Sequence, residues 1–272
     1  MKFEEGNIYF SKIYVIQSLS EKERKTGTEL HDDIISRRAW FDPNLSTELI
    51  DVFSRREILS VLERIKTETA KKENIPFIHF ETHGTKNGLS LKSNENVLWD
   101  DILPIIREIN VFSGNNLFIS ISACWGGNIQ FQIKIHEKCP FRGFIGPIDE
   151  IYPSDLITSF TPFFDELLQN NDFDKAIKRL NLYNNSGVKF HHLNSEAFFD
   201  IVLEYHKEQC KKDPRIEEER IESIAKSYWK KDNRVRNHYK TKGRFKKFVK
   251  KFSEKETPKL YFGMRNNFLH IS

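Results

Sequence analysis

The sequence predicts an α/β protein with a mostly parallel central sheet, followed by a helical C-terminal extension. Strand-like and helix-like segments alternate from the N-terminal region to about residue 183. Two short apolar runs, 77–80 and 117–121, are separated by enough residues for one crossover helix, which would make them neighbouring parallel strands. We therefore expect residues 1–183 to form the α/β domain and residues 184–272 to form a helical, basic domain with a regulatory or interaction role.

The opening segments predict a strand, a loop, a helix and a second strand. Residues 7–18 are rich in β-branched and aromatic side chains, which is typical of one or two strands. Residues 21–43 are polar, and we expect a long loop that forms a flap near the site. Ser54 with Glu57 three positions later is a capping-box pattern, and the apolar spacing after it predicts a helix to about residue 72.

The remaining segments before residue 184 continue the alternation. We expect, in order, a hairpin or loop at 85–96, a helix opened by Trp99 and Asp100, a turn at 113–116, a helix at 128–138, a short buried strand at 143–146, an apolar helix capped by Asp155 that reaches Leu168, and a helix at 173–182.

Composition argues for a protein of the cytoplasm. No apolar run approaches the roughly 18 residues of a membrane span. The N-terminus carries acidic residues where a signal peptide needs basic ones, so we expect cytoplasmic localisation and no membrane partner. The three cysteines, Cys124, Cys139 and Cys210, lack metal-type spacing and fit a reducing compartment. We expect Cys139 and Cys210 to be structural.

The character of the chain changes after residues 184–187, and helices are expected at 195–211 and 214–231. Between Lys230 and Lys251 the sequence has many basic residues and one acid, Asp232, and the bases are interleaved with Phe245, Phe248 and Val249. This pattern predicts a helix with one basic face. Such a face is usually only solvated, but it is also the pattern that contacts a polyanion or an acidic partner.

The chemistry is concentrated where the two apolar runs end. His83 and Gly84 follow the first run, and Cys124 follows the second. Neighbouring parallel strands place their carboxyl ends side by side, where a thiol and an imidazole can act as nucleophile and base. The N–H groups of Gly84 and Cys124 are candidates for an oxyanion site, in which one donor contributes on the order of 3 kcal/mol. This chemistry requires no metal or organic cofactor.

The arrangement of an apolar strand before His-Gly, a crossover, and an apolar strand before Ala-Cys-x-Gly resembles the caspase-like cysteine peptidases, including metacaspases and bacterial CHAT proteases. Trp99-Asp100, residues 144–147 and the Phe-rich helix after them add to the similarity, which covers about residues 8–183. The resemblance implies a three-layer sandwich and an endopeptidase with His83 as base and Cys124 as nucleophile. In some relatives calcium is needed.

The resemblance also implies biological context. A cytoplasmic endopeptidase must be restrained, so an activating protein or a small ligand is expected besides the protein or peptide substrate. Bacterial relatives often act in defence against phage.

The expected substrate pocket departs from the metacaspase pattern. There, an acidic residue two positions before the cysteine helps to bind a basic side chain, whereas this chain has Ser122. Glu81 shares a strand face with His83 and could orient the imidazole or line the pocket. Asp149 is a further pocket candidate. Other acids that cannot be ranked against it are Asp32, Asp33, Glu150 and Asp155.

Three other functions fit the same sequence. The chain could be a catalytically silent caspase-like module that binds a partner, a ligand or nucleic acid through its basic extension. It could be a nucleic-acid-binding protein, or another Cys/His hydrolase such as an amidase. A lone buried cysteine is usually a small apolar side chain. The paired position of His83 and Cys124 favours the enzyme.

Overall fold

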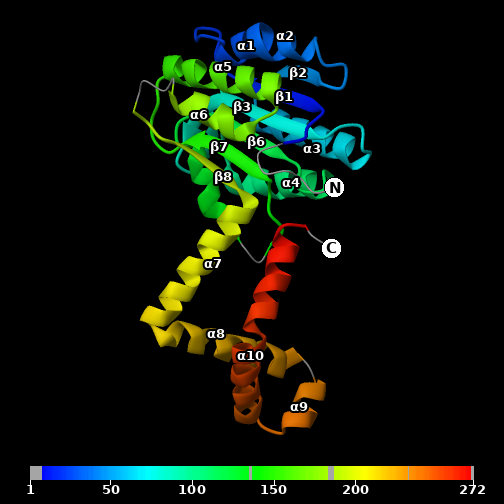
Figure 1. Ribbon diagram of the computed structural model, residues 1–272, viewed down its shortest axis with the longest axis vertical. Helices are drawn as coiled ribbons and strands as arrows, with labels where there is room; N and C mark the ends of the chain where they lie inside the picture. Colours follow the sequence, from blue (N-terminus) through cyan, green and yellow to red (C-terminus); the bar gives the residue numbers. More distant parts are fainter. Residues whose placement is uncertain (1–7, 135–136, 183–186, 232, 271–272) are drawn as a thin grey trace. The chain divides into compact units, whose positions relative to one another are not determined.

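The computed structural model describes residues 8–134, 137–182, 187–231 and 233–270, which form two compact units (Figure 1). Unit 1 comprises Met1–Lys134 with Lys138–Ser195, and unit 2 comprises Ile135–Glu137 with Glu196–Ser272. The expected domain boundary at 184–187 lies almost wholly outside the described residues. The units divide later, after Ser195, because the strand at Phe190–Asn194 still belongs to the sheet of unit 1.

A mixed, mostly parallel sheet forms the middle of unit 1, as the sequence predicts. Its six-strand path runs β2-β1-β3-β6-β7-β8, and only the β7–β8 pair is antiparallel. A short hairpin of two further strands extends β3. The strands are β1 (Lys12–Ser18), β2 (Ser46–Asp51), β3 (Pro76–Thr85), β4 (Gly88–Ser90), β5 (Asn96–Leu98), β6 (Phe118–Ser122), β7 (Gly143–Pro147) and β8 (Phe190–Asn194).

Two helices, α3 (Arg55–Ala70) and α4 (Trp99–Phe112), cover one face of the sheet. Their apolar residues recur at helical spacing and are buried against the strands, among them Ile58, Leu62, Ile65, Ile102, Ile106 and Ile109. Half of the predicted capping box of α3 is present, because the Ser54 side chain accepts a hydrogen bond from the Glu57 amide at 3.3 Å, whereas the Glu57 carboxylate accepts from the Phe53 amide and not from that of Ser54.

The opposite face is covered by α5 (Pro153–Asn170) and α6 (Phe173–Leu182), so unit 1 has helix, sheet and helix layers. Aromatic rings fill this side of the core. Phe77 on β3 meets Phe164 on α5 edge to face, with ring centroids 5.5 Å apart. A third helical segment lies against α5 and consists of α1 (Thr26–Leu30), a π-helical turn (His31–Ile35) and α2 (Ser36–Ala39).

That third segment corrects the prediction of a loop at 21–43. Residues 26–39 are helical, with Leu30 and Ile35 buried in the core. Leu30 and Ile35 are buried in the core and Ile34 packs against it, while most of the other side chains of the segment are polar, so its composition is that of a loop. Strand β2 was missed because it forms the sheet edge, where none of its residues is fully buried.

Two local predictions were also wrong. The expected helix at 128–138 is a shorter 3₁₀ segment, η2 (Gly126–Gln132). Asp155 does not cap α5, because Pro153 begins the helix and Tyr152 is its N-cap residue. A proline is well suited to the first helical position, where no amide hydrogen bond is needed.

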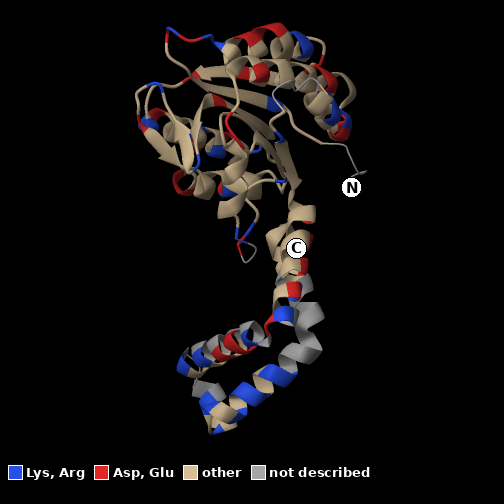
Figure 2. Ribbon diagram, turned by 90° about the vertical axis from the view of Figure 1, so that its left-hand side faces the viewer, with Lys and Arg blue, Asp and Glu red and all other residues tan. Residues whose placement is uncertain are grey.

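Unit 2 is helical, with α7 (Ser195–Lys212) leading into it, followed by α8 (Pro214–Lys231), α9 (Asn233–Tyr239) and α10 (Lys242–Phe268) (Figure 2). Helices α8, α9 and α10 share a small apolar core that contains Ile221, Ala225, Phe245 and Val249, with Trp229 and Tyr239 packed against it. Among the residues that the structure describes, no helix is both long and apolar enough to cross a membrane.

Candidate active site

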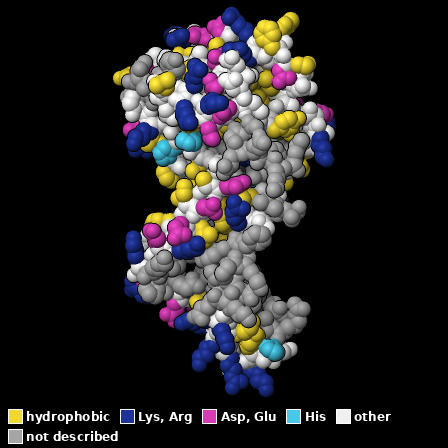
Figure 3. Space-filling model, viewed as in Figure 1, with side chains coloured by type: hydrophobic (Ala, Val, Ile, Leu, Met, Phe, Trp, Pro, Cys, Tyr) yellow, Lys and Arg dark blue, Asp and Glu magenta, His cyan; other side chains and the backbone are white. Residues whose placement is uncertain are grey.

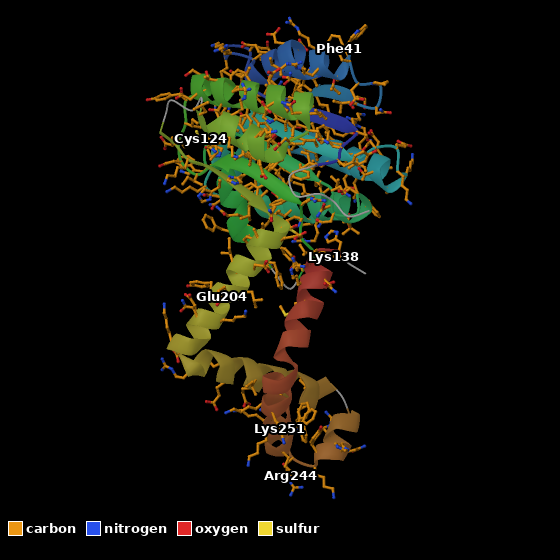
Figure 4. The ribbon with its side chains drawn as sticks, viewed as in Figure 1. Phe41, Cys124, Lys138, Glu204, Arg244 and Lys251 are labelled. Atoms are coloured by element: carbon orange, nitrogen blue, oxygen red, sulfur yellow. The ribbon has the colours of Figure 1, made fainter. Side chains whose placement is uncertain are left out.

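His83 and Cys124 lie at the same end of two neighbouring parallel strands. Strand β3 pairs with β6, and the last matched residues are Glu81 and Ser122. His83 and Cys124 each follow two positions later, so they share a register and a sheet face. Cys124 is labelled in Figure 4. The two side chains therefore come to the carboxyl end of the sheet, where open α/β sheets bind their ligands.

Gly84 holds the backbones of these two strand ends together. A Cβ atom built on Gly84 would lie 1.9 Å from the carbonyl oxygen of Cys124 and 2.9 Å from its amide nitrogen. Such a contact is possible only for glycine, because the obstructing atoms are backbone. The two proposed oxyanion donors, the N–H groups of Gly84 and Cys124, thus belong to backbone segments in direct contact.

The chain turns sharply after Cys124. The left-handed conformation falls on Trp125, with φ of 53°, and not on Gly126 or Gly127. Those glycines are needed for close packing instead. A Cβ on Gly126 would lie 2.5 Å from Ile121, and one on Gly127 would lie 3.0 Å from a carbonyl oxygen. A bulky residue in this conformation is uncommon and is typical of functional sites.

The segment 149–151 lies against the Cys124 thiol. The amide of Ile151 donates to Sγ at 3.5 Å, and Sγ in turn lies 3.6 Å from the Ile151 carbonyl oxygen. Asp149 contributes its carbonyl oxygen, which accepts a hydrogen bond from the Trp125 amide at 3.2 Å. The Asp149 side chain accepts from the Glu150 amide, so this pocket candidate lies next to the turn at Cys124 and Trp125.

His83 has a carboxylate partner that the sequence did not suggest. Its Nε2 atom lies 2.5 Å from Oε1 of Glu23, while Oε2 of Glu23 accepts a hydrogen bond from the Ser20 amide at 2.7 Å. Partial burial disfavours the ionised carboxyl, but the Ser20 hydrogen bonds and the nearby imidazole outweigh it and lower the pKa of Glu23. A hydrogen bond from Nε2–H to Glu23 leaves Nδ1 as the nitrogen that can accept a proton.

The Glu81 side chain is buried and hydrogen-bonded to residues other than His83. It is 4% exposed, and its carboxylate accepts from the Thr26 hydroxyl at 2.6 Å and contacts Nε2 of His79 at 3.0 Å. His79 continues the network through Nδ1 to the Ser120 hydroxyl at 2.7 Å. Of the two roles considered for Glu81, orienting His83 belongs to Glu23 in this structure.

Ser122 is the register neighbour of Glu81 and is 1% exposed. Its hydroxyl has no hydrogen-bond partner among the described residues. A buried polar atom of this kind is unusual in a folded protein. It lies on the face of β6 that carries Cys124, two residues away.

Two of the other acidic candidates, Asp32 and Asp33, have local partners. Asp32 pairs with His31, and Asp33 pairs with Arg37 on the same helical segment. Cys139 is buried, and this burial raises the pKa of its thiol to about 12, which makes it unreactive near neutral pH. The side chain of Cys210 lies outside the described residues. No cluster of metal-binding side chains occurs in the part of the chain that the structure describes.

Sequence reasoning missed Glu23 and the Ile151 amide. Glu23 belongs to the polar stretch assigned to a loop and lies 60 positions from its histidine, so no spacing rule connects them. The Ile151 donor is a backbone N–H group, so the pattern of side chains in the sequence does not indicate it. One signal could have pointed to Glu23. Residues that follow the ends of parallel strands gather at one edge of the sheet, and Glu23 follows the end of β1.

No family model matches the chain, and no curated protein matches it. The fold and site therefore define its class by geometry: an α/β protein whose mostly parallel sheet carries a thiol and an imidazole at the carboxyl ends of adjacent strands.

Proposed function

We propose that this protein is a caspase-like cysteine peptidase in which Cys124 is the nucleophile and His83 the general base. The observation that supports this proposal is the shared register of the two residues beyond β3 and β6, on one face of the sheet. The substrate is a protein or peptide, and the proposed chemistry uses no cofactor.

In the proposed reaction, His83 takes the thiol proton and Sγ of Cys124 attacks the scissile carbonyl carbon. The carbonyl oxygen becomes an oxyanion, and the N–H groups of Gly84 and Cys124 are placed to stabilise it. The protonated imidazole then gives its proton to the leaving amine as the C–N bond breaks, which leaves a thioester. Water, deprotonated by His83, hydrolyses the thioester and restores the thiol.

Glu23 and Ile151 support the two reacting groups in this proposal. The Glu23 carboxylate holds Nε2–H, which fixes the tautomer with a basic Nδ1 and favours the imidazolium once it forms. The Ile151 amide donates to the sulfur, and such a donor interacts more favourably with a thiolate than with a thiol.

Unit 2 is a candidate regulator. We propose that the peptidase is restrained in the cytoplasm until a protein or ligand signal arrives, with defence against phage as one setting for that signal. The extension lies outside the sheet that carries the site, so it can change without altering the core of unit 1.

The test is a proteome-wide comparison of new N-termini after incubating an extract with the wild type, Cys124→Ala, or His83→Ala. Cleavage that both substitutions abolish supports the peptidase. Cys139→Ala is the matched control, because it removes a buried thiol outside the site and should retain cleavage. Hydrolysis of small amides without any peptide cleavage would identify an amidase instead, and a folded protein with no thiol reactivity at Cys124 would indicate a silent binding module.

A further inference from the structure

We propose that the outer face of α10 binds a nucleic-acid strand through its phosphates. This outer face consists of Arg244, Lys247 and Lys251, with Lys250 at its edge, and all four side chains are exposed. Figure 3 shows dark-blue basic side chains gathered at this end of unit 2, and Figure 4 labels Arg244 and Lys251 there. The inference stands on unit 2 alone and does not depend on the peptidase.

The inner face of the same helix is already used. Phe245 and Val249 are buried in the core shared with α8. Lys242 and Lys246 lie on this side too, and both pair with Glu222 on α8, at 2.7 Å and 2.9 Å. The two cations lower the pKa of Glu222 to about 2, so its carboxylate is charged at neutral pH and stays paired with Lys242 and Lys246. Among the described residues, Glu222 and Glu218 thus pair with the inner bases, Lys242 and Lys246.

The outer bases form an unpaired row. In the part of unit 2 that the structure describes, no carboxylate forms an ion pair with Arg244, Lys247 or Lys251. Residues three, four and seven apart lie on one side of a helix, so these three align along α10. Seven residues rise about 10 Å, which matches about three phosphates at 3.4 Å each along one strand of a duplex.

The remaining features favour nucleic acid over other anionic partners. A helix that lies on a membrane needs a free apolar face, but the apolar face of α10 is buried against α8. A stable protein interface needs a desolvated apolar centre, whereas the one aromatic residue beside the outer face, Phe248, packs its ring against Tyr239 at 5.0 Å and is only partly exposed, so the row of bases favours phosphates.

The test is fluorescence anisotropy of labelled oligo(dT) and of a labelled duplex with the full-length protein, over a range of salt concentrations. With three to four phosphates engaged, the slope of log K against log salt should be about −3 for the duplex, so affinity falls about sixtyfold between 50 and 200 mM salt, and the slope should be somewhat smaller for oligo(dT). The triple variant R244E/K247E/K251E should lose most of this salt dependence and bind at least about tenfold more weakly.

The control triple variant is K71E/K72E/K178E, which makes the same charge change on exposed lysines of unit 1. The neutral triple R244Q/K247Q/K251Q repeats the test without introducing acids, and circular dichroism checks the helices of each variant. Loss of binding in both α10 variants with retention in the control supports the proposal. Absence of salt-dependent binding by the wild type, or equal weakening in the control, overturns it. Binding to anionic vesicles but not to either oligonucleotide also overturns it.

Discussion

Glu23 places Oε1 2.5 Å from Nε2 of His83, although 60 residues separate them in the chain. The carboxylate is itself held by the Ser20 amide, just beyond the end of β1. The strand ends of β1, β3 and β6 therefore supply, in order, a carboxylate, an imidazole and a thiol. This order gives the candidate site three members where the sequence suggested two.

Glu23→Gln should lower kcat about tenfold to a hundredfold and leave KM nearly unchanged, because the amide no longer stabilises the imidazolium that forms in the transition state. Steady-state kinetics on a peptide identified by the cleavage profile measures both constants. Glu21→Gln is the matched control, since it changes a neighbouring exposed glutamate that pairs with Lys25. An equal loss in both variants would contradict a specific role for Glu23.

The same pair predicts a pH dependence. The pKa of Glu23 is lowered in the folded protein. The stabilisation that its ionised carboxylate gives is therefore fully present above the ordinary pKa of 4.5 and is lost as pH falls through the lowered pKa of the folded protein. The activity ratio of wild type to Glu23→Gln should therefore be constant near neutral pH and approach one in acid. If the activity ratio does not change as the Glu23 carboxyl becomes protonated, the charge of Glu23 does not contribute to activity.

Gly84→Ala should damage both stability and activity. Its Cβ would overlap the Cys124 carbonyl oxygen, and the strands must separate to relieve this, at about 1–3 kcal/mol of unfolding free energy. Displacing one oxyanion donor should reduce kcat by about a hundredfold or more. Gly263→Ala is the control: it sits in α10 with no atom within 4 Å of the added methyl, and should stabilise slightly. Denaturant unfolding and kinetics compare them.

Thiol labelling should separate Cys124 from Cys139. Cys124 is partly exposed, whereas burial raises the pKa of Cys139 to about 12. In the native protein, iodoacetamide should modify Cys124 within minutes and leave Cys139 unmodified until denaturant is added. Peptide mass spectrometry distinguishes the sites, and His83→Ala should slow labelling at Cys124 alone. Rapid native labelling of Cys139 would contradict the burial described here.

Shortening the chain should show where unit 1 ends. A protein that stops after Ser195 keeps β8 and should fold, while one that stops after Lys189 loses Phe190, whose ring lies 5.6 Å from that of Phe160. Loss of that buried ring alone should lower the unfolding free energy by about 3 kcal/mol or more. Thermal melts compare the two proteins.

The protein that stops after Ser195 also tests restraint by unit 2. Its basal cleavage rate should rise if the extension holds the enzyme inactive. A folded, truncated protein that cleaves at the rate of the full-length chain would refute that role.

The sequence predicted the strands that carry the site because their signal is local. β3 and β6 are short apolar runs bounded by turn residues, and the crossover length made them parallel neighbours. β2 and residues 26–39 gave no such signal. An edge strand faces solvent on its free side, and a helical segment docked by Leu30, Ile34 and Ile35 among mostly polar residues has the composition of a loop.

The candidate site was predictable to a similar extent. Two members follow apolar runs, so strand register predicts their meeting. Glu23 depends on how the segment after β1 folds back over β3, which no short-range pattern encodes. Glu81 was a reasonable candidate by strand alternation, but its partners, Thr26 and His79, bury it.

The backbone contact between Gly84 and Cys124 packs the end of β3 directly against the residues that follow β6. This contact favours a fixed spacing between His83 and Cys124, because the two backbones are already at the closest approach that glycine allows. Glu23 comes from a separate segment, between β1 and α1, which does not take part in the contact between Gly84 and Cys124. A signal that displaces this one carboxylate would tune the chemistry while leaving the assembled pair in place.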